Sequence, residues 1–129
     1  MKAAMGASGA DQGGEITVAG VTLVAREVTG LDKDGLRALV DRHRTRIGSG
    51  VVVLAAPSDG KVTIVVGVTP DLTKTAPAGQ LVKQLASIVG GGGGGRADFA
   101  EAGGKDVARV PVMLAAASGI LEKMLKSPP

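Results

Sequence analysis

Apolar residues recur at helical spacing in three stretches of the chain. The first stretch follows Asp32, whose side chain is suited to cap the first amides of a helix, and Asp34 adds a favourable negative charge to the first turn. Gly48 and Gly50 mark its end. Its apolar positions follow the i, i+3, i+4, i+7, i+11 spacing of a buried stripe: Leu36, Leu39, Val40, His43 and Ile47. This pattern predicts a helix over about 32–47.

Two later stretches have the same periodicity. One covers about 76–89, and the other begins at Pro111, which suits the first turn of a helix because no amide donor is needed there, and runs to about 126. The apolar positions of the first are Ala78, Leu81, Val82, Leu85, Ile88 and Val89. Those of the second are Val110, Met113, Leu114, Ala117, Ile120, Leu121 and Met124. The chain therefore has about three predicted helices.

Strands are predicted between and beside these helices. Residues 51–56 are continuously apolar, as in a central strand covered on both faces, and a turn at 57–60 leads into a strand over 62–68 that returns antiparallel. A first strand lies near Thr22 and Val24, and a short one follows at 99–102. A strand, helix and strand in succession favour a parallel crossover. We expect an α/β fold, a small two-layer sandwich with a mixed, mainly parallel sheet of about four to five strands.

Residues 1–14 differ in composition from the rest of the chain. They are small, rich in glycine and without apolar periodicity, which predicts a flexible linker. The boundary is placed near Glu15, so that residues 15–129 form one domain. A flexible linker in front of a small domain suits a module tethered to other domains.

Composition narrows the possible chemistry. The 129 residues suffice for one domain, and a formal charge of +3 is a mild bias toward polyanions rather than a strongly basic coat. The chain has no cysteine, one histidine and one aromatic residue, Phe99, which argues against a disulfide framework, a thiolate metal site and base stacking on aromatic platforms. No apolar stretch is long enough to span a membrane. We expect no metal, no cofactor, no membrane contact and a cytoplasmic location.

A run of six glycines followed by an arginine is the main candidate for a binding site. Bare backbone amides in such a run can form a concave anion site, and the fork of the arginine can grip a phosphate group. A P-loop is excluded because the run follows a helix and lacks the Gly-Lys-Ser/Thr ending. The predicted phosphate- and nucleic-acid-binding residues are Gly90, Gly91, Gly92, Gly93, Gly94, Gly95, Arg96, Asp98, Gly103, Gly104 and Lys105. Alternatively, the glycines only allow a tight turn, with Arg96 paired to Asp98 or Glu101.

Two other features have a structural and a functional interpretation. His43 lies on an apolar helical face, which favours a core position over a general base. Arg42, Arg44 and Arg46, with Arg37 earlier on the same helix, could follow a phosphate backbone, but such charges are typical of a solvated helix surface, which we expect here. No catalytic residue is therefore predicted.

The string GGGGGGRADFAEAGG at 90–104 resembles the glycine-rich signature near the C-terminus of bacterial alanyl-tRNA synthetases, a DHHA-type module shared with DHH phosphoesterases. Segments 23–28, 49–55, 61–69 and 78–82 resemble the same module in the same order. Four positions depart from the family's usual form: Gly92 replaces a basic residue, Ala97 a proline, Phe99 a methionine and Glu101 a glutamine. The first and last departures make the segment less positive.

The resemblance implies a tRNA-binding C-terminal domain of an alanine–tRNA ligase. In that family the domain holds the outer corner of tRNA and helps to link aminoacylation and editing, so the implied partners are tRNA and the catalytic and editing domains of a parent chain. The chain alone is then not an enzyme but part of one. Two alternatives stay open: a substrate-phosphate-binding domain of a DHH-type phosphoesterase, and a structural module that forms a homodimer.

Overall fold

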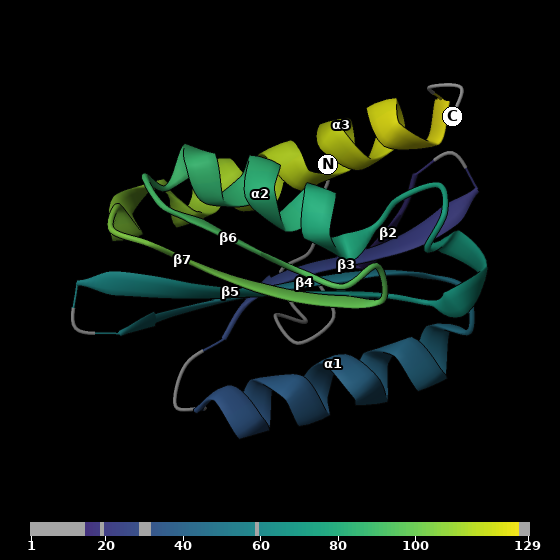
Figure 1. The fold of residues 1–129 in the computed structure, drawn as a ribbon, viewed down its shortest axis with the longest axis horizontal. Helices are drawn as coiled ribbons and strands as arrows, with labels where there is room; N and C mark the ends of the chain where they lie inside the picture. Colours follow the sequence, from purple (N-terminus) through teal and green to yellow (C-terminus); the bar gives the residue numbers. More distant parts are fainter. Residues whose placement is uncertain (1–14, 19, 29–31, 59, 127–129) are drawn as a thin grey trace.

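The computed structural model describes residues 15–18, 20–28, 32–58 and 60–126 (Figure 1). The predicted linker, residues 1–14, lies outside these ranges. The predicted domain boundary therefore stays a prediction.

A six-stranded sheet runs through the described part of the chain. Its strands are β2 (Glu15–Val18), β3 (Val21–Glu27), β4 (Gly50–Ser58), β5 (Lys61–Val68), β6 (Gly92–Gly95) and β7 (Phe99–Gly104). Their order across the sheet is β2-β3-β4-β5-β7-β6. Only the pair β3 and β4 is parallel, and the other four pairs are antiparallel.

The α/β sandwich with about three helices is confirmed, while the sheet differs in two respects from the prediction. It has six strands rather than four to five, and it is mainly antiparallel rather than mainly parallel. The physical reason is that only two or three residues separate β2 from β3, β4 from β5 and β6 from β7, and neighbouring strands with so short a connection pair antiparallel. A helix also connects β5 to β6, but β7 inserts between those two strands and pairs antiparallel with both.

Helices cover both faces of the sheet (Figure 1). The helix α1 (Lys33–Ile47) lies on one face, and α2 (Ala78–Ile88) and α3 (Val110–Lys126) lie on the other. Two short 3-10 helices, η1 (Pro70–Leu72) and η2 (Val107–Arg109), precede α2 and α3. The larger apolar core lies between the sheet and the pair α2 and α3, and a smaller one lies under α1. The side chains of β4 from Val51 to Ala55 are fully buried, as expected of a strand covered on both faces.

The boundaries of α1 agree with the local signals. The Oδ1 atom of Asp32 accepts a hydrogen bond of 2.8 Å from the amide of Gly35, which caps the helix. At the other end Gly48 has a φ of 75°, and its amide donates to the carbonyl of Arg44 at 3.1 Å. Leu36, Val40 and His43 are buried on the sheet side. The predicted core position of the histidine is thus confirmed.

Candidate nucleic-acid interface

The glycine run forms an edge strand rather than an irregular loop. Gly90 ends α2 with a φ of 69°, and the amide of Gly91 donates to the carbonyl of Ala86 at 2.9 Å. Residues 92–95 then form β6, which pairs only with β7 and leaves its other edge unpaired within the sheet. A concave amide site needs residues of alternating φ sign, whereas only Gly90 within this run has a positive φ. The run therefore does not form the predicted concave amide site.

Alternate glycines of the run are required by packing. A Cβ atom on Gly91 would overlap the carbonyl oxygen of Gly103, and one on Gly93 would overlap the backbone of Ala102. A Cβ on Gly95 would lie 2.6 Å from the Cα of Ala100. In contrast, a Cβ on Gly92 would have no atom within 4 Å. Gly90 is needed for a tight turn, as in the alternative interpretation of the glycines. Gly91, Gly93 and Gly95 are needed because β7 approaches their backbone closely.

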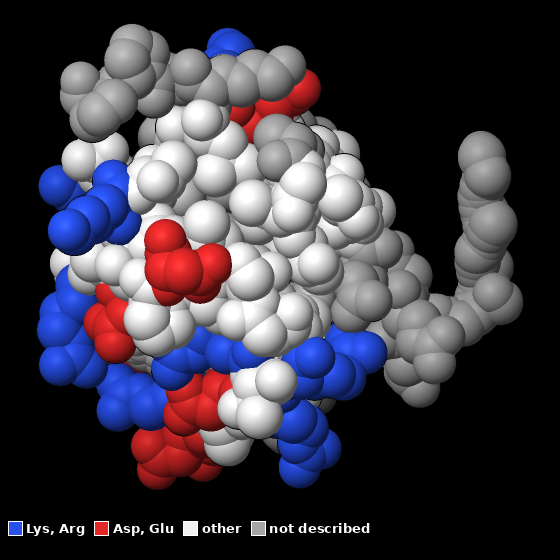
Figure 2. Space-filling model, turned by 90° about the vertical axis from the view of Figure 1, so that its right-hand side faces the viewer, with Lys and Arg blue, Asp and Glu red and all other residues white. Residues whose placement is uncertain are grey.

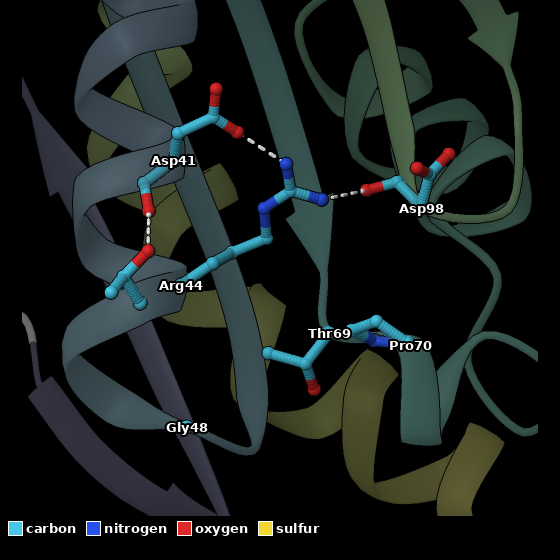
Figure 3. Close-up of a pocket in the computed structure, with 7 residues that line it drawn as sticks. Asp41, Arg44, Gly48, Thr69, Pro70 and Asp98 are labelled. Carbon is cyan, nitrogen blue, oxygen red and sulfur yellow. Dashed lines mark hydrogen bonds and ion pairs between the residues drawn. The ribbon is translucent and has the colours of Figure 1, made fainter.

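The turn that follows β6 is held from both faces of the sheet. The carbonyls of Arg96 and Ala97 accept hydrogen bonds of 3.1 and 2.9 Å from the first amides of α2, those of Gly79 and Ala78. The carbonyl of Asp98 accepts from the amide of Val68 at 2.9 Å. It also accepts from the Nη1 atom of the α1 residue Arg44 at 3.0 Å (Figure 3). The backbone of this turn is therefore fixed by two helices.

Arg96 extends its side chain from this fixed backbone into solvent. Its side chain is 83% exposed, and its Nε atom lies 3.8 Å from Oδ1 of Asp98, whose side chain is 49% exposed. An ion pair at that distance and exposure contributes little to stability, so the guanidinium can exchange it for a phosphate group at small cost. The predicted pairing of Arg96 with Asp98 and its predicted phosphate contact are thus compatible.

An open pocket of about 310 Å³ lies between α2 and β6, beside this arginine. Its lining residues are Pro77, Gly79, Gln80, Lys83, Gly94, Gly95, Arg96 and Ala97. Three of these belong to the predicted site, but the α2 residues Gln80 and Lys83 were not predicted. A single lysine on the polar side of a helix gives no sequence signal, because only the pairing of β6 with β7 brings α2 alongside the glycine strand.

Three further predicted site residues, Gly103, Gly104 and Lys105, lie at or just beyond the C-terminal end of β7. Gly103 and Gly104 end the strand, and a Cβ on Gly104 would lie 2.7 Å from the carbonyl oxygen of Val89, so this glycine allows close contact with the end of α2. The amide of Lys105 donates to the same carbonyl at 2.9 Å. Because a strand rises about 3.3 Å per residue, Lys105 lies roughly 20 Å from the turn at Arg96. The structure therefore does not bring these two basic residues together.

A second pocket, of about 420 Å³, lies on the α1 side of the sheet (Figure 3). It is lined by Asp41, Arg44, Thr45, Gly48, Thr69, Pro70 and Asp98. The guanidinium of Arg44 points between Asp41, with which it forms an ion pair, and the backbone carbonyl of Asp98. The charge of Arg44 is thus already compensated, so this pocket is not suited to bind an anion. We call the contact of Arg44 with Asp41 and with the carbonyl of Asp98, which connects α1 to the turn after β6, the joint.

A hydroxyl cluster lies next to this joint. The Oγ1 atom of Thr69 accepts from the amide of Gly50 at 3.0 Å and donates to Asp71 at 2.6 Å, and the hydroxyl of Ser49 donates to the same carboxylate at 2.5 Å. The hydrogen bonds from Ser49 and then Thr69 lower the pKa of Asp71 below its ordinary value. The cluster ties the start of β4 to the end of β5.

The arginines of α1 do not form a free basic stripe. Arg37 stacks over the ring of Phe99, with its Cζ atom 4.9 Å from the ring centroid, and its Nη2 atom lies 3.3 Å from Oε2 of Glu101. The Nη2 atom of Arg46 lies 3.3 Å from Nδ1 of His43. In Figure 2, basic and acidic side chains are interspersed over the lower part of the face, where α1 lies. The prediction that the arginines of α1 lie on a solvated helix surface is therefore confirmed, except for the half-buried Arg44.

Glu101, the acidic departure from the family pattern, lies on the α1 face of the sheet beside Arg37. Its charge is therefore directed away from the pocket between α2 and β6. Among the residues that the structure describes, no group of three or more histidine, aspartate or glutamate side chains could hold a metal ion. No helix of the described ranges is long and apolar enough to cross a membrane.

Comparison with known proteins gives consistent matches over this fold. The family model described as "DHHA1 domain" matches residues 13–123. Alanine–tRNA ligases from Chromohalobacter salexigens and Magnetococcus marinus are each 47% identical, over 84% and 85% of this chain. The chain spans only 12% of the length of either relative.

Two solved structures resemble the fold. The C-Ala domain of the alanyl-tRNA synthetase from Aquifex aeolicus matches with a TM-score of 0.79 and 30% identity, over 84% of this chain and 97% of that domain. A DHH-domain protein of the s1p family of ribosomal proteins matches with a TM-score of 0.57 and 14% identity, over 84% of this chain and 27% of that one. The second likeness concerns the fold alone.

Proposed function

The chain belongs to the DHHA1 domain family, and we propose that it is the tRNA-binding C-terminal domain of an alanine–tRNA ligase. In this role it holds the outer corner of tRNA and helps to deliver one tRNA to the aminoacylation and editing portions of a parent enzyme. The 30% identity to a C-Ala domain that is covered over 97% of its length supports the assignment. The low coverage of the full-length relatives fits one module of a larger enzyme.

The main observation in support of this proposal is that Arg96 combines a fixed backbone with an exposed side chain. The carbonyl of Arg96 accepts a hydrogen bond from the amide of Gly79 in α2, and Arg44 holds the same turn through the carbonyl of Asp98. The side chain of Arg96 is 83% exposed. A fixed arginine fork can bind a phosphate group bidentately without losing backbone entropy on binding. Phosphate contacts position a nucleic acid but do not read its sequence. We therefore expect recognition of tRNA shape rather than of the alanine identity itself.

Such a domain increases the rate of a tethered enzyme without chemistry of its own. Binding the body of a tRNA converts the meeting of its acceptor end with an active site into an intramolecular event, and the gain is set by effective concentration. A homodimer and a cytoplasmic location stay predictions; the mass measured at several protein concentrations tests the first.

The test is the salt-dependent binding of this chain to three RNAs: an alanine tRNA, a non-cognate tRNA and a short single strand. We expect both tRNAs to bind more tightly than the single strand, and the Arg96→Ala variant to lower the magnitude of the salt slope by about one. The matched control is Arg109→Ala, since Arg109 is also exposed and paired with an aspartate, Asp106, at 3.4 Å. Equal binding of all three RNAs would contradict the proposal.

A further inference from the structure

The two described pockets differ in their charged lining. The pocket beside Arg44 contains two aspartates, and its arginine is engaged by one of them and by backbone carbonyls. The pocket between α2 and β6 is lined by two basic residues, Lys83 and Arg96, and by no carboxylate residue. Of the two, only the second is lined by more basic than acidic residues, and the ion pair of its arginine with Asp98 is long, at 3.8 Å, and exposed to solvent.

Lys83 reaches this pocket from α2, across the glycine strand. A Cβ atom on Gly94 would lie 3.6 Å from the Cε atom of Lys83, so the end of the lysine side chain lies against β6. No ion pair joins Lys83 to a carboxylate among the residues that the structure describes. Lys83 is an exposed residue that lines the pocket, so its side chain is available to a ligand.

Gly94 is a glycine although packing does not require one. The distance of 3.6 Å is an ordinary van der Waals contact, unlike the overlaps that a Cβ would create at Gly93 and Gly95. A larger side chain at 94 would fit the strand but would fill the pocket beside Lys83. The glycine therefore keeps the space between Lys83 and Arg96 open.

The N-terminal amides of α2 do not complete this site. Those of Ala78 and Gly79 already donate to the carbonyls of Ala97 and Arg96, and those of Gln80 and Leu81 donate to the carbonyl of Pro77 at 3.1 Å each. The charged groups that line this pocket are the side chains of Lys83 and Arg96. An ammonium group and a guanidinium group from two different elements are suited to neighbouring phosphate groups of one backbone.

From these observations we propose that Lys83 and Arg96 together bind the sugar–phosphate backbone of the tRNA in the pocket between α2 and β6. This inference rests on the proposed function and assigns to it a second phosphate-binding residue and a place of contact. The pocket of about 310 Å³ is at the small end for ligand sites, which suits a segment of backbone rather than an enclosed nucleotide.

The experiment measures tRNA affinity against salt for Lys83→Ala, for the pocket-filling variant Gly94→Val and for the charge-matched control Lys61→Ala, since Lys61 is an exposed lysine at the start of β5. We expect Lys83→Ala to weaken binding roughly three- to tenfold at low salt and to lower the magnitude of the slope by about one. Gly94→Val removes no charge and is expected to weaken binding by a similar factor. Lys61→Ala is expected to leave the affinity within about twofold.

A double variant, Lys83→Ala with Arg96→Ala, tests whether the two residues bind one segment. Residues that share a ligand segment give a non-additive loss, whereas independent sites give the product of the two single losses. Circular dichroism of each variant verifies that the fold is kept. If the wild-type chain binds tRNA and Lys83→Ala and Gly94→Val bind equally well, this inference is wrong and the proposed function stands. If the wild-type chain shows no preference for tRNA, both are wrong.

Discussion

The packing of the glycine strand β6 predicts opposite effects on stability for alanine substitutions at Gly95 and Gly92. Replacing Gly95 with alanine places a Cβ atom 2.6 Å from the Cα and 2.9 Å from the Cβ of Ala100, and 2.8 Å from the carbonyl oxygen of Phe99. Carbon atoms pack favourably at about 3.5–4.0 Å, so β6 must move by roughly 1 Å away from β7. Two of the atoms in its way belong to backbone, which cannot change rotamer. Overpacking of this kind costs about 1–3 kcal/mol.

Gly92 provides the matched control at the other end of β6. A Cβ atom there would meet nothing within 4 Å, and Gly92 is not among the glycines with positive φ. Replacement of such a glycine by alanine stabilises a protein by about 0.4–1 kcal/mol, because the unfolded chain loses conformational freedom. The free energies of unfolding of Gly92→Ala and Gly95→Ala should therefore differ by about 1.5–4 kcal/mol.

The assay is urea unfolding followed by far-ultraviolet circular dichroism, since the chain has no tryptophan or tyrosine for fluorescence. Because β6 is an edge strand, part of the loss at Gly95 can be local, and hydrogen exchange of the β7 amides detects such opening. Equal stability and equal exchange of the two variants would refute the packing explanation of the glycine run.

Three further predictions concern the joint, the departures from the family pattern and pH. Arg44→Met removes the hydrogen bond to the Asp98 carbonyl and an ion pair, and we expect a loss of about 2 kcal/mol in urea unfolding. Arg42→Met, an exposed position on the same helix, should lose under about 0.5 kcal/mol, and similar losses would contradict the role of the joint. Gly92→Lys, in open space, should leave stability within about 0.5 kcal/mol and raise tRNA affinity with a steeper salt slope; an unchanged slope would exclude this position from the interface. The lowered pKa of Asp71 contributes stability above the ordinary carboxyl pKa, and this contribution is lost as the pH falls through the lowered value. Asp71→Asn should therefore lose less stability than the wild type between about pH 5 and pH 2, and parallel pH curves would disprove this coupling.

Local signals identified the helices and the central strands. Asp32 and Gly48 set the ends of α1 through hydrogen bonds within one turn, and the continuous apolar run of β4 shows burial on both faces. The strand β6 could not be predicted in this way. Its glycines have no side chains and hence no apolar or polar alternation, and only the pairing with β7 makes them a strand. The mainly antiparallel character of the sheet was missed for a related reason, since β2 and β6 were not predicted as strands and the pairing of β7 with β5 is non-local.

Only those residues of the candidate site that belong to a sequence motif could be predicted. Arg96 follows directly from the glycine run, and the structure adds that two helices fix the turn to which it belongs. Lys83 is distant in sequence and becomes a neighbour of Gly94 through the packing of α2 on β6. Lys105 was also among the predicted residues, but the length of β7 separates it from Arg96.

The central claim is that tRNA binds at the pocket between α2 and β6, and amide NMR spectra of the chain during titration with tRNA test it most directly. We predict that the shifted or broadened amides cluster at Gln80, Lys83, Gly94, Gly95 and Arg96, with the same set for an alanine tRNA and a non-cognate tRNA. Changes that are confined to the amides of α1 or α3, with those of the pocket unaffected at saturating tRNA, would contradict the account.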